Sequence, residues 1–493
     1  MLNEGYMKKT NRTITHICVL AFAAAAVLAA VSCKTAPEAP RGDGPAASEK
    51  QEQAAEAYTR AGFAENLKRL LEEKRFEEAL ASFRNVPEAD ASSFEFRMMK
   101  LSIMISAEKL AEAEELAGAL AAEQPANTDV MYARAVIATA AGDMKGRTAH
   151  LEAVLKADPN HSQAMTGLAL DLLGKKSYKR AKDLLVKAIA SDPQNSDALL
   201  GLARVYYIQA DLEKAGDTLN LALKKAPEDS ILWAELARVK SETMDLPGAI
   251  DDIEKAIGID SDIYGHWIDY GTYLISGSKK AEARTAFSRA IELKPAEYLP
   301  YIYRAGLNDD LGNEDEALSD YRKVTELYPQ YFYAAESLGI LLWGRGDYAG
   351  ARAAFLLALE GNPKNVSYAL MATLCSYRQE KEDEAKNFMG KYITTLDRNS
   401  TEYFLCRLFV DRAGDSEVLN RIMKEKNLNT RNRMLFYSAM YYDLFQNKSI
   451  AQKYFIEIVS LPAPNFFEFR LSQWELKRLE SAADTNSSQS VQG

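Results

Sequence analysis

The residues best suited to catalysis or metal binding are scattered along the sequence. The histidines are His16, His150, His161 and His266. No two of them form a His-x-x-x-His pair, and none stands with a cysteine at the spacing of a metal site. The sequence therefore predicts neither a metal centre nor a cofactor that histidines would hold.

Short motifs that could bind phosphate or catalyse hydrolysis are incomplete. Gly344-x-Gly346 lacks the rest of a dinucleotide fingerprint and stands where a turn between helices is expected. There is no phosphate-binding P-loop and no Gly-x-Ser-x-Gly elbow. The pair Asp251-Asp252 is more typical of a solvated helix face than of acid–base catalysis. We therefore predict that the chain is not an enzyme. An unrecognised site built on an acid such as Asp269 or Glu336 is the less favoured alternative.

Two of the four cysteines, Cys375 and Cys406, lie in the body of the chain. Four cysteines are too few for a disulfide scaffold. Export would allow these two to pair, because they fall in neighbouring segments of the repeat described below. The alternative, favoured by the composition, is a pair of small buried apolar side chains.

Cys33 follows a pattern typical of an export signal. Three basic residues precede an apolar run over 17–31, which is too short to span a bilayer comfortably, and small residues then lead to Cys33. This segment resembles bacterial lipoprotein precursors. That resemblance implies a signal peptide over 1–32 and a lipid such as palmitate on Cys33. Ala30 stands where leucine is commonest in that family, so ordinary cleavage without lipid is the alternative.

The segment 33–59 is rich in Pro, Ala and Gly and has no apolar periodicity, which predicts a flexible tether. The whole chain has a net charge of −10, and removing residues 1–32, which carry +2, leaves −12. An acidic surface disfavours nucleic acid as a partner, because the phosphates require Lys and Arg. The resemblance to lipoproteins implies export, a lipid anchor and a periplasm-facing position. The absence of an aspartate after Cys33 leans towards the outer membrane.

Two residue types recur every 34 positions. The prolines on this grid are Pro125, Pro159, Pro193, Pro227, Pro295, Pro329 and Pro363. The alanines are Ala79, Ala113, Ala181, Ala215, Ala249, Ala283, Ala317, Ala351 and Ala385, and the series is interrupted only at Arg147. The off-grid Pro247 and Pro300 fall at expected helix starts, where proline is tolerated.

Within one unit, 162–195, apolar residues at helical spacing predict two helices separated by a polar turn. A 34-residue period with these residues resembles the tetratricopeptide repeat (TPR) family. The resemblance implies an all-α fold, an α-solenoid that is a right-handed superhelix of TPR helix-turn-helix units. We expect ten units over 60–399, two degenerate units over 400–465, a capping helix over 466–480 and a disordered tail over 481–493.

Solenoids of this family usually bind ligands in a concave groove lined by the first helix of each unit. On our phasing the residues predicted to line it are Arg204, Tyr207, Arg238, Tyr333, Glu336, Trp343, Tyr377 and Phe404. Aromatic and arginine side chains dominate binding hot spots. The alternative is that some of these residues pack on the adjoining repeat or on the terminal helices.

The sequence thus predicts a membrane-anchored envelope scaffold that binds protein partners, in a process such as envelope or secretion-apparatus assembly. The alternative function is binding of cell-wall glycan or another small ligand, with Tyr333, Trp343 and Tyr377 stacking on it. Neither the partner nor the oligomeric state follows from the sequence.

Overall fold

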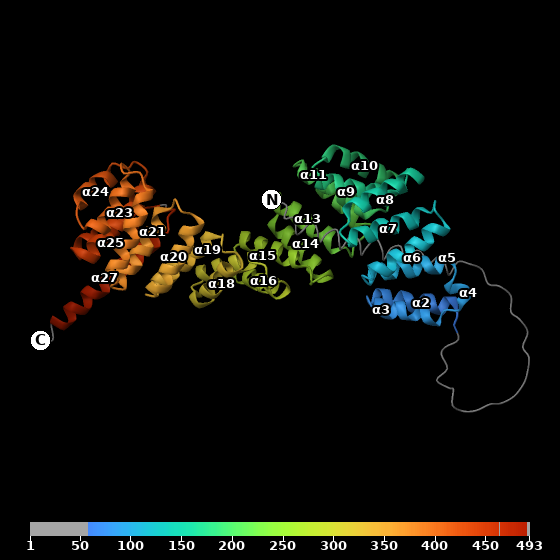
Figure 1. Ribbon diagram of the computed structural model, residues 1–493, viewed down its shortest axis with the longest axis horizontal. Helices are drawn as coiled ribbons and strands as arrows, with labels where there is room; N and C mark the ends of the chain where they lie inside the picture. Colours follow the sequence, from blue (N-terminus) through green and yellow to red (C-terminus); the bar gives the residue numbers. More distant parts are fainter. Residues whose placement is uncertain (1–57, 463, 491–493) are drawn as a thin grey trace, which may run out of the picture. The chain divides into compact units, whose positions relative to one another are not determined.

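The computed structural model describes residues 58–462 and 464–490, and this part of the chain forms an α-solenoid of 26 α-helices without strands (Figure 1). Consecutive helices pack as antiparallel pairs, which bury their apolar faces only by stacking on neighbouring pairs. The chain divides into two compact units, one ending at Ser261 and one beginning at Asp262. We call them unit 1 and unit 2.

Unit 1 is built from successive helix pairs. They are α2 (Arg60–Glu72) with α3 (Phe76–Ser82), α5 (Phe94–Ser106) with α6 (Leu110–Glu123), α7 (Thr128–Ala140) with α8 (Met144–Ala157), α9 (Ser162–Gly174) with α10 (Tyr178–Ser191), α11 (Ser196–Ile208) with α12 (Leu212–Leu223), and α13 (Ser230–Glu242) with α14 (Leu246–Ile259). The short elements η1 (Phe83–Asn85) and α4 (Glu88–Ala91) connect the first two pairs.

Unit 2 continues the same construction and ends in a single helix. Its pairs are α15 (Tyr264–Ser276) with α16 (Lys280–Leu293), α17 (Leu299–Asp310) with α18 (Glu314–Leu327), α19 (Phe332–Gly344) with α20 (Tyr348–Gly361), α21 (Val366–Arg378) with α22 (Glu382–Tyr392), α23 (Thr401–Asp411) with α24 (Asp415–Met423), and α25 (Leu428–Phe445) with α26 (Lys448–Val459). The 3₁₀ turn η2 (Ile393–Thr395) follows α22, and the single helix is α27 (Glu468–Ser490).

In each of the first ten pairs, the turn between the two helices contains one residue in the left-handed backbone region. These residues repeat at 34-residue spacing: Lys74, Glu108, Gly142, Lys176, Ala210, Met244, Ser278, Gly312, Gly346 and Glu380. After Glu380 the spacing changes, and the next such residues are Arg412 and Gly414. The backbone therefore keeps one repeat length over the first ten pairs, although seven of these turns lack the glycine that favours this conformation.

The nine alanines of the grid all lie on second helices, and all nine are fully buried. An alanine at this position allows two helix backbones to approach closely. Arg147 interrupts the grid and is also buried, with 7% of its surface exposed. Its guanidinium pairs with Asp171 and donates to the carbonyl of Gly167, so the charge is compensated inside the helix packing.

Prolines lie where the repeat predicts them. The grid prolines follow the ends of second helices, and Pro247 and Pro300 occupy the first turns of α14 and α17. Polar caps begin several first helices. The side chain of Asn195 accepts from the backbone nitrogen of Ala198, and that of Asn365 accepts from Ser367.

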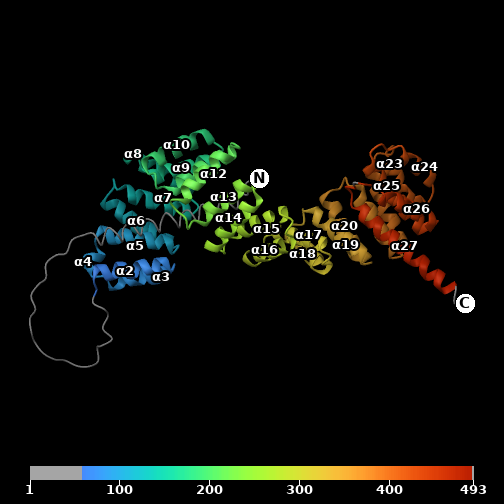
Figure 2. The same ribbon diagram turned by 180° about the vertical axis from the view of Figure 1, so that it is seen from behind.

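The final helix is longer than expected. The sequence placed its end at residue 480 and a disordered tail after it, whereas α27 continues to Ser490. In Figure 2, α27 leaves the end of unit 2 after packing on α26 and α25, and it also contacts α19. The contact with α19 brings α27 to the helix that carries three of the predicted groove residues, Tyr333, Glu336 and Trp343.

Candidate binding surfaces

In unit 1 the structure brings together three predicted groove residues around an acid. Arg204 on α11 donates through Nε to Oε1 of Glu235 at 2.9 Å, and Arg238 on α13 pairs with the other carboxylate oxygen. The Arg238 guanidinium lies 5.1 Å from the ring centroid of Tyr207, whose hydroxyl donates to Glu242 at 3.1 Å. We call these five residues the Glu235 cluster.

The Glu235 cluster has a buried centre and an accessible rim. The side chain of Glu235 is 5% exposed, whereas those of Arg204 and Arg238 are 18% and 22% exposed. The repeat positions these two arginines, because they stand 34 residues apart on equivalent helices. Two guanidiniums beside an aromatic ring suit the recognition of a carboxylate or a peptide. Sequence reasoning missed Glu235, although its place one turn before Arg238 puts both on one helix face.

In unit 2 the predicted groove residue Trp343 is covered by α27. Its side chain is 3% exposed, and its indole nitrogen donates to Oε1 of Glu475 at 2.9 Å. The next residue, Gly344, leaves room for Trp474, because a Cβ at this position would lie 2.7 Å from the Trp474 ring. The expectation that Trp343 faces an open groove is therefore corrected: a terminal helix of the same chain occupies that place.

Charged side chains fix α27 on both sides. Arg378 donates to Glu475 and to Asp443, each at 2.8 Å, and Arg478 of α27 pairs with the same two acids. Arg470 binds both carboxylate oxygens of Asp309 on α17, at 2.7 and 2.8 Å. Such paired contacts define the register of a helix more closely than apolar contacts do.

A fully buried carboxylate lies at the start of α27. Oε1 of Glu468 accepts from the hydroxyls of Ser367 on α21 and Tyr437 on α25. Burial raises the pKa of Glu468, because desolvation disfavours the charged form more than the two hydrogen bonds favour it. Burial raises the pKa of Tyr437 in the same way.

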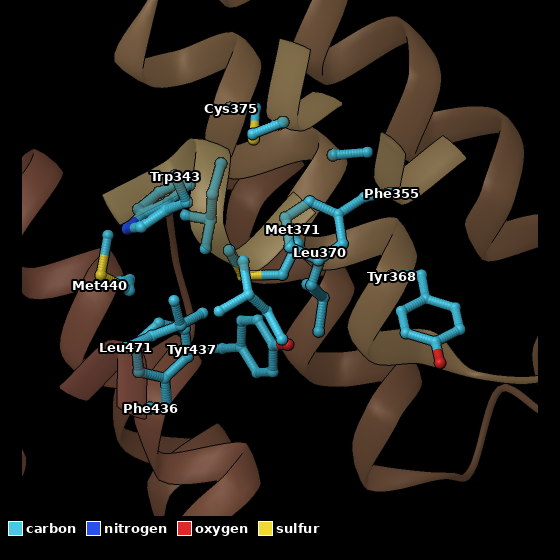
Figure 3. Packing of buried hydrophobic residues seen from close by; sticks show 14 of the residues in the cluster. Trp343, Phe355, Tyr368, Leu370, Met371, Cys375, Phe436, Tyr437, Met440 and Leu471 are labelled. Atoms are coloured by element: carbon cyan, nitrogen blue, oxygen red, sulfur yellow. The ribbon is translucent and has the colours of Figure 1, made fainter. Parts of the chain in front are cut away.

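Apolar contacts complete the seat of α27. Phe467, just before the helix, stacks on Phe355 and Tyr368 at centroid distances of 6.1 and 6.2 Å. Leu471 is fully buried, and Figure 3 shows it beside Tyr437. The residues that receive α27 through polar contacts we call the α27-binding surface: Asp309, Trp343, Ser367, Arg378, Tyr437 and Asp443.

Three further predicted residues of unit 2 make contacts within the chain. Glu336 accepts from the Tyr368 hydroxyl at 2.6 Å, and burial raises the pKa of Glu336. Tyr377 is 8% exposed and donates to the carbonyl of Phe409. The Arg421 guanidinium lies 3.9 Å from the ring centroid of Phe404. Packing on adjoining repeats, the alternative left open by the sequence, is therefore observed for Glu336, Tyr377 and Phe404.

Tyr333 is 55% exposed and belongs to a surface cluster of aromatic rings. Tyr298 stacks on Tyr328 with a centroid distance of 4.6 Å, and Tyr331 lies 5.7 Å from Tyr333 and 6.3 Å from Tyr298. Tyr298 precedes α17, Tyr328 and Tyr331 precede α19, and Tyr333 lies in the first turn of α19. We call Tyr298, Tyr328, Tyr331 and Tyr333 the tyrosine cluster. The sequence analysis did not predict this cluster, although its four tyrosines lie within four residues of Pro295 or Pro329 on the 34-residue proline grid.

The cysteines and histidines among the described residues are buried or half-buried. Cys375 and Cys406 are free and buried, and burial raises the pKa of both thiols, so the pairing allowed by the sequence is not observed. His266 is fully buried, and burial lowers the pKa of His150 and His161. No group of three His, Cys, Asp or Glu side chains in the described part is placed to hold a metal ion.

Cys33, the predicted lipidation site, lies outside the described residues, as do the signal peptide and nearly all of the tether. Within 58–462 and 464–490, no helix combines the length and apolarity needed to cross a bilayer.

Comparison with known proteins places the repeats in a family. Family models described as Tetratricopeptide repeat match residues 172–239 and 307–366, one segment in each unit. Both segments lie on the 34-residue grid; the first contains the whole pair α11 and α12, and the second contains the whole pair α19 and α20. The chain is a tetratricopeptide repeat protein. The regular left-handed turns extend the same repeat length beyond the matched segments.

A curated relative matches part of the repeat array. DnaJ homolog subfamily C member 3 from Rattus norvegicus is 27% identical over 155 residues, which are 31% of this chain and 29% of that protein. The chain thus spans less than a third of the relative's length.

Among solved structures, a tetratricopeptide repeat protein from Parabacteroides merdae is 15% identical, with a TM-score of 0.34 over 51% of this chain and 98% of that chain. Human IFIT1, solved as a dimer with PPP-AAAA, is 12% identical, with a TM-score of 0.44 over 68% of this chain and 83% of that chain.

Proposed function

We propose that this chain is an exported scaffold, anchored to a bacterial membrane by a lipid on Cys33, that binds protein partners through its repeats. The tetratricopeptide repeats support a protein-interaction role, and the proposal assigns the chain no catalysis. The anchor rests on the sequence pattern before Cys33. The envelope location, on the periplasmic side and in the outer membrane, rests on the same pattern.

The Glu235 cluster is the observation that carries partner binding in unit 1. Its arginines are held in place by a buried acid, so little side-chain entropy is lost when they bind a partner. Tyr207 supplies a ring beside them. Arginine and tyrosine are the residue types that dominate interface energetics, each worth on the order of 2 kcal/mol when central. A peptide with an acidic side chain and an apolar neighbour fits this arrangement.

A crosslinking pull-down from envelope extract tests the proposed binding. The bait is residues 54–493, compared with the double variant Tyr207→Ala, Arg238→Ala. A matched control, Arg289→Ala, removes an arginine whose side chain is 40% exposed in unit 2. We expect one protein to be captured by the wild-type and control baits and to be at least tenfold reduced with the double variant. Equal capture by all three baits would contradict the role of the Glu235 cluster.

The anchor has its own test. Cells expressing the full chain would be labelled with a palmitate analogue, and the label is expected on the wild-type protein and absent from Cys33→Ser. Unlabelled wild-type protein that is nevertheless cleaved before Cys33 would support ordinary signal peptidase processing instead.

The second candidate function, binding of a glycan, is favoured by the tyrosine cluster. Sugar rings stack on exposed aromatic faces, and Tyr333 and Tyr328 are 55% and 39% exposed. Trp343 and Tyr377, which were expected to share this role, are buried. Cosedimentation with purified peptidoglycan that is lost in Tyr328→Ala, Tyr333→Ala would establish this function.

A further inference from the structure

The face that α27 buries in unit 2 differs from that of an ordinary terminal cap. A capping helix covers the last apolar surface of a solenoid and presents a polar outer face. The buried face of α27 instead carries Glu468, Ser472 and Glu475, with 0%, 0% and 3% of their surfaces exposed. Leu471 lies between them along the helix, and Leu479 lies one turn after Glu475; both leucines are buried. The contact therefore depends on polar recognition as well as on apolar burial.

Two acidic residues of α27, Glu468 and Glu475, each accept hydrogen bonds from side chains of other helices in unit 2. Glu468 and Glu475 are seven residues apart, which places them on one face two turns apart. Ser367 and Tyr437 donate to the first acid, and Trp343 and Arg378 donate to the second. These four donors come from α19, α21 and α25, so the site exists only because the repeats stack in this order.

A basic residue of α27 is also bound by another helix of unit 2. Arg470, two residues after Glu468, donates to both carboxylate oxygens of Asp309 on α17. Its guanidinium also lies 4.6 Å from the ring centroid of Trp474, which fits against Gly344. The sequence pattern that the surface recognises is therefore Glu-x-Arg-Leu, followed by an acid seven residues after the first.

The fit of α27 leaves polar groups without hydrogen-bond partners. Oε2 of Glu468, Oδ1 of Asp443 and Nε of Arg378 are buried and form no hydrogen bond with any described residue. Such groups lose their hydration when α27 docks and regain it when α27 leaves. Replacing the buried ion pairs by apolar contacts would hold a permanent cap at least as firmly. The polar interface therefore favours a contact that can be exchanged.

We propose that the α27-binding surface is a receptor for an amphipathic helix of a partner protein, and that α27 is its intramolecular occupant. The partner helix presents two acidic residues seven positions apart and an arginine two positions after the first. It replaces α27 rather than binding on top of it. This inference rests on the proposed scaffold function only in that it names the kind of partner, and it concerns a surface separate from the Glu235 cluster.

The test uses the full chain and a fluorescent peptide of residues 466–490. Loosening α27 should open the surface, so we compare the wild-type chain with the double variant Arg470→Asp, Trp474→Ala, whose changes both lie on α27. The aspartate repels Asp309, and the alanine removes the ring that fits against Gly344, while the receiving surface is unchanged. The matched control is Gly306→Ala, where an added Cβ meets no atom within 4 Å. We expect the loosened variant to bind the peptide at least tenfold more tightly than the wild-type and control chains.

Two further variants define specificity. Adding Arg378→Ala to the loosened variant, or Glu475→Gln to the peptide, is expected to weaken binding at least tenfold. Binding that ignores both changes would overturn the proposal. So would a loosened variant that keeps its circular dichroism but binds no better than the wild type.

Hydrogen exchange on the wild-type chain covers the case in which the loosened variant fails to fold. With excess peptide, the amides of the chain's own α27 are expected to exchange faster while those of α21 stay protected. Unchanged exchange in α27 at saturating peptide would overturn the proposal. Because the peptide assay needs no envelope partner, it can succeed or fail independently of the pull-down.

Discussion

Trp343 and Glu475 are 132 positions apart in the sequence and share a buried hydrogen bond of 2.9 Å. This single contact joins a first helix of the repeat array to the terminal helix. It explains why an aromatic residue expected in an open groove has almost no exposed surface. The groove of unit 2 is filled at this point by the chain itself.

Trp343→Phe is expected to lower the free energy of unfolding of unit 2 by about 1–3 kcal/mol. The substitution keeps an aromatic ring in place and removes the only donor of the indole. Arg378 and Arg478 still hold Glu475, so the loss should not be larger. Urea denaturation followed by circular dichroism measures it, with Trp233→Phe, which removes a partly exposed donor to the carbonyl of Pro227, as the control. A loss equal to that of the control would contradict a special role for this bond.

Glu468→Gln should change how stability depends on pH. The folded state raises the pKa of Glu468, so its contribution is fully present below the unfolded pKa, about 4.3, and is lost as pH rises through the folded value. Glutamine stays neutral and can still accept from Ser367 and Tyr437. We expect the variant to be more stable than the wild type at pH 7 and similar to it near pH 4. Urea unfolding of both chains between pH 4 and 8 measures this, and parallel curves would contradict it.

Met244→Gly is expected to stabilise unit 1 by about 0.5–1 kcal/mol. Met244 has a φ of +64° and a side chain that is 77% exposed, so it bears the cost of the left-handed region without burying apolar surface. That cost is about 1–2 kcal/mol, and the greater chain entropy of glycine offsets part of the gain. Gly312→Ala, at the equivalent turn in unit 2, should have the opposite sign. Thermal unfolding that moves both variants in the same direction would contradict the account of these turns.

Arg147→Ala restores the alanine grid and is nevertheless expected to destabilise unit 1 by about 3 kcal/mol, because it leaves Asp171 buried without its cation. The double variant Arg147→Ala, Asp171→Ala should recover most of that loss. Denaturant titrations of the wild type, both single variants and the double variant form the required cycle. Additive losses would show that the pair is not coupled.

Much of the fold could be predicted from the sequence, because each residue type that recurs in the repeat has a single structural role. Proline marks the ends of second helices, and alanine marks close helix contacts. The left-handed turns are equally regular in the structure but less visible in the sequence. Lysine, glutamate, serine, alanine and methionine all occupy them, since one small local cost is tolerated in a packed array.

The binding surfaces were less predictable, because periodicity identifies a helix face without identifying what covers it. Arg204, Tyr207 and Arg238 were expected in one groove, and they do come together. Trp343 occupies the same position in its repeat as Tyr207 does in an earlier one. Only the placement of α27 shows that Trp343 is buried. The clue was the buried face of that helix, where Glu468, Ser472 and Glu475 share a side with Leu471. Acids on a stripe of this kind need donors on the receiving surface.

Photo-crosslinking from the Glu235 cluster tests the scaffold function most directly. A photoreactive amino acid would replace Tyr207 in the full chain in cells, and a control probe would replace Met423, which is 43% exposed on α24. The account predicts a discrete protein adduct at Tyr207 that is absent at Met423. No protein adduct at Tyr207, or the same adducts at both positions, would contradict the claim that this surface binds protein partners.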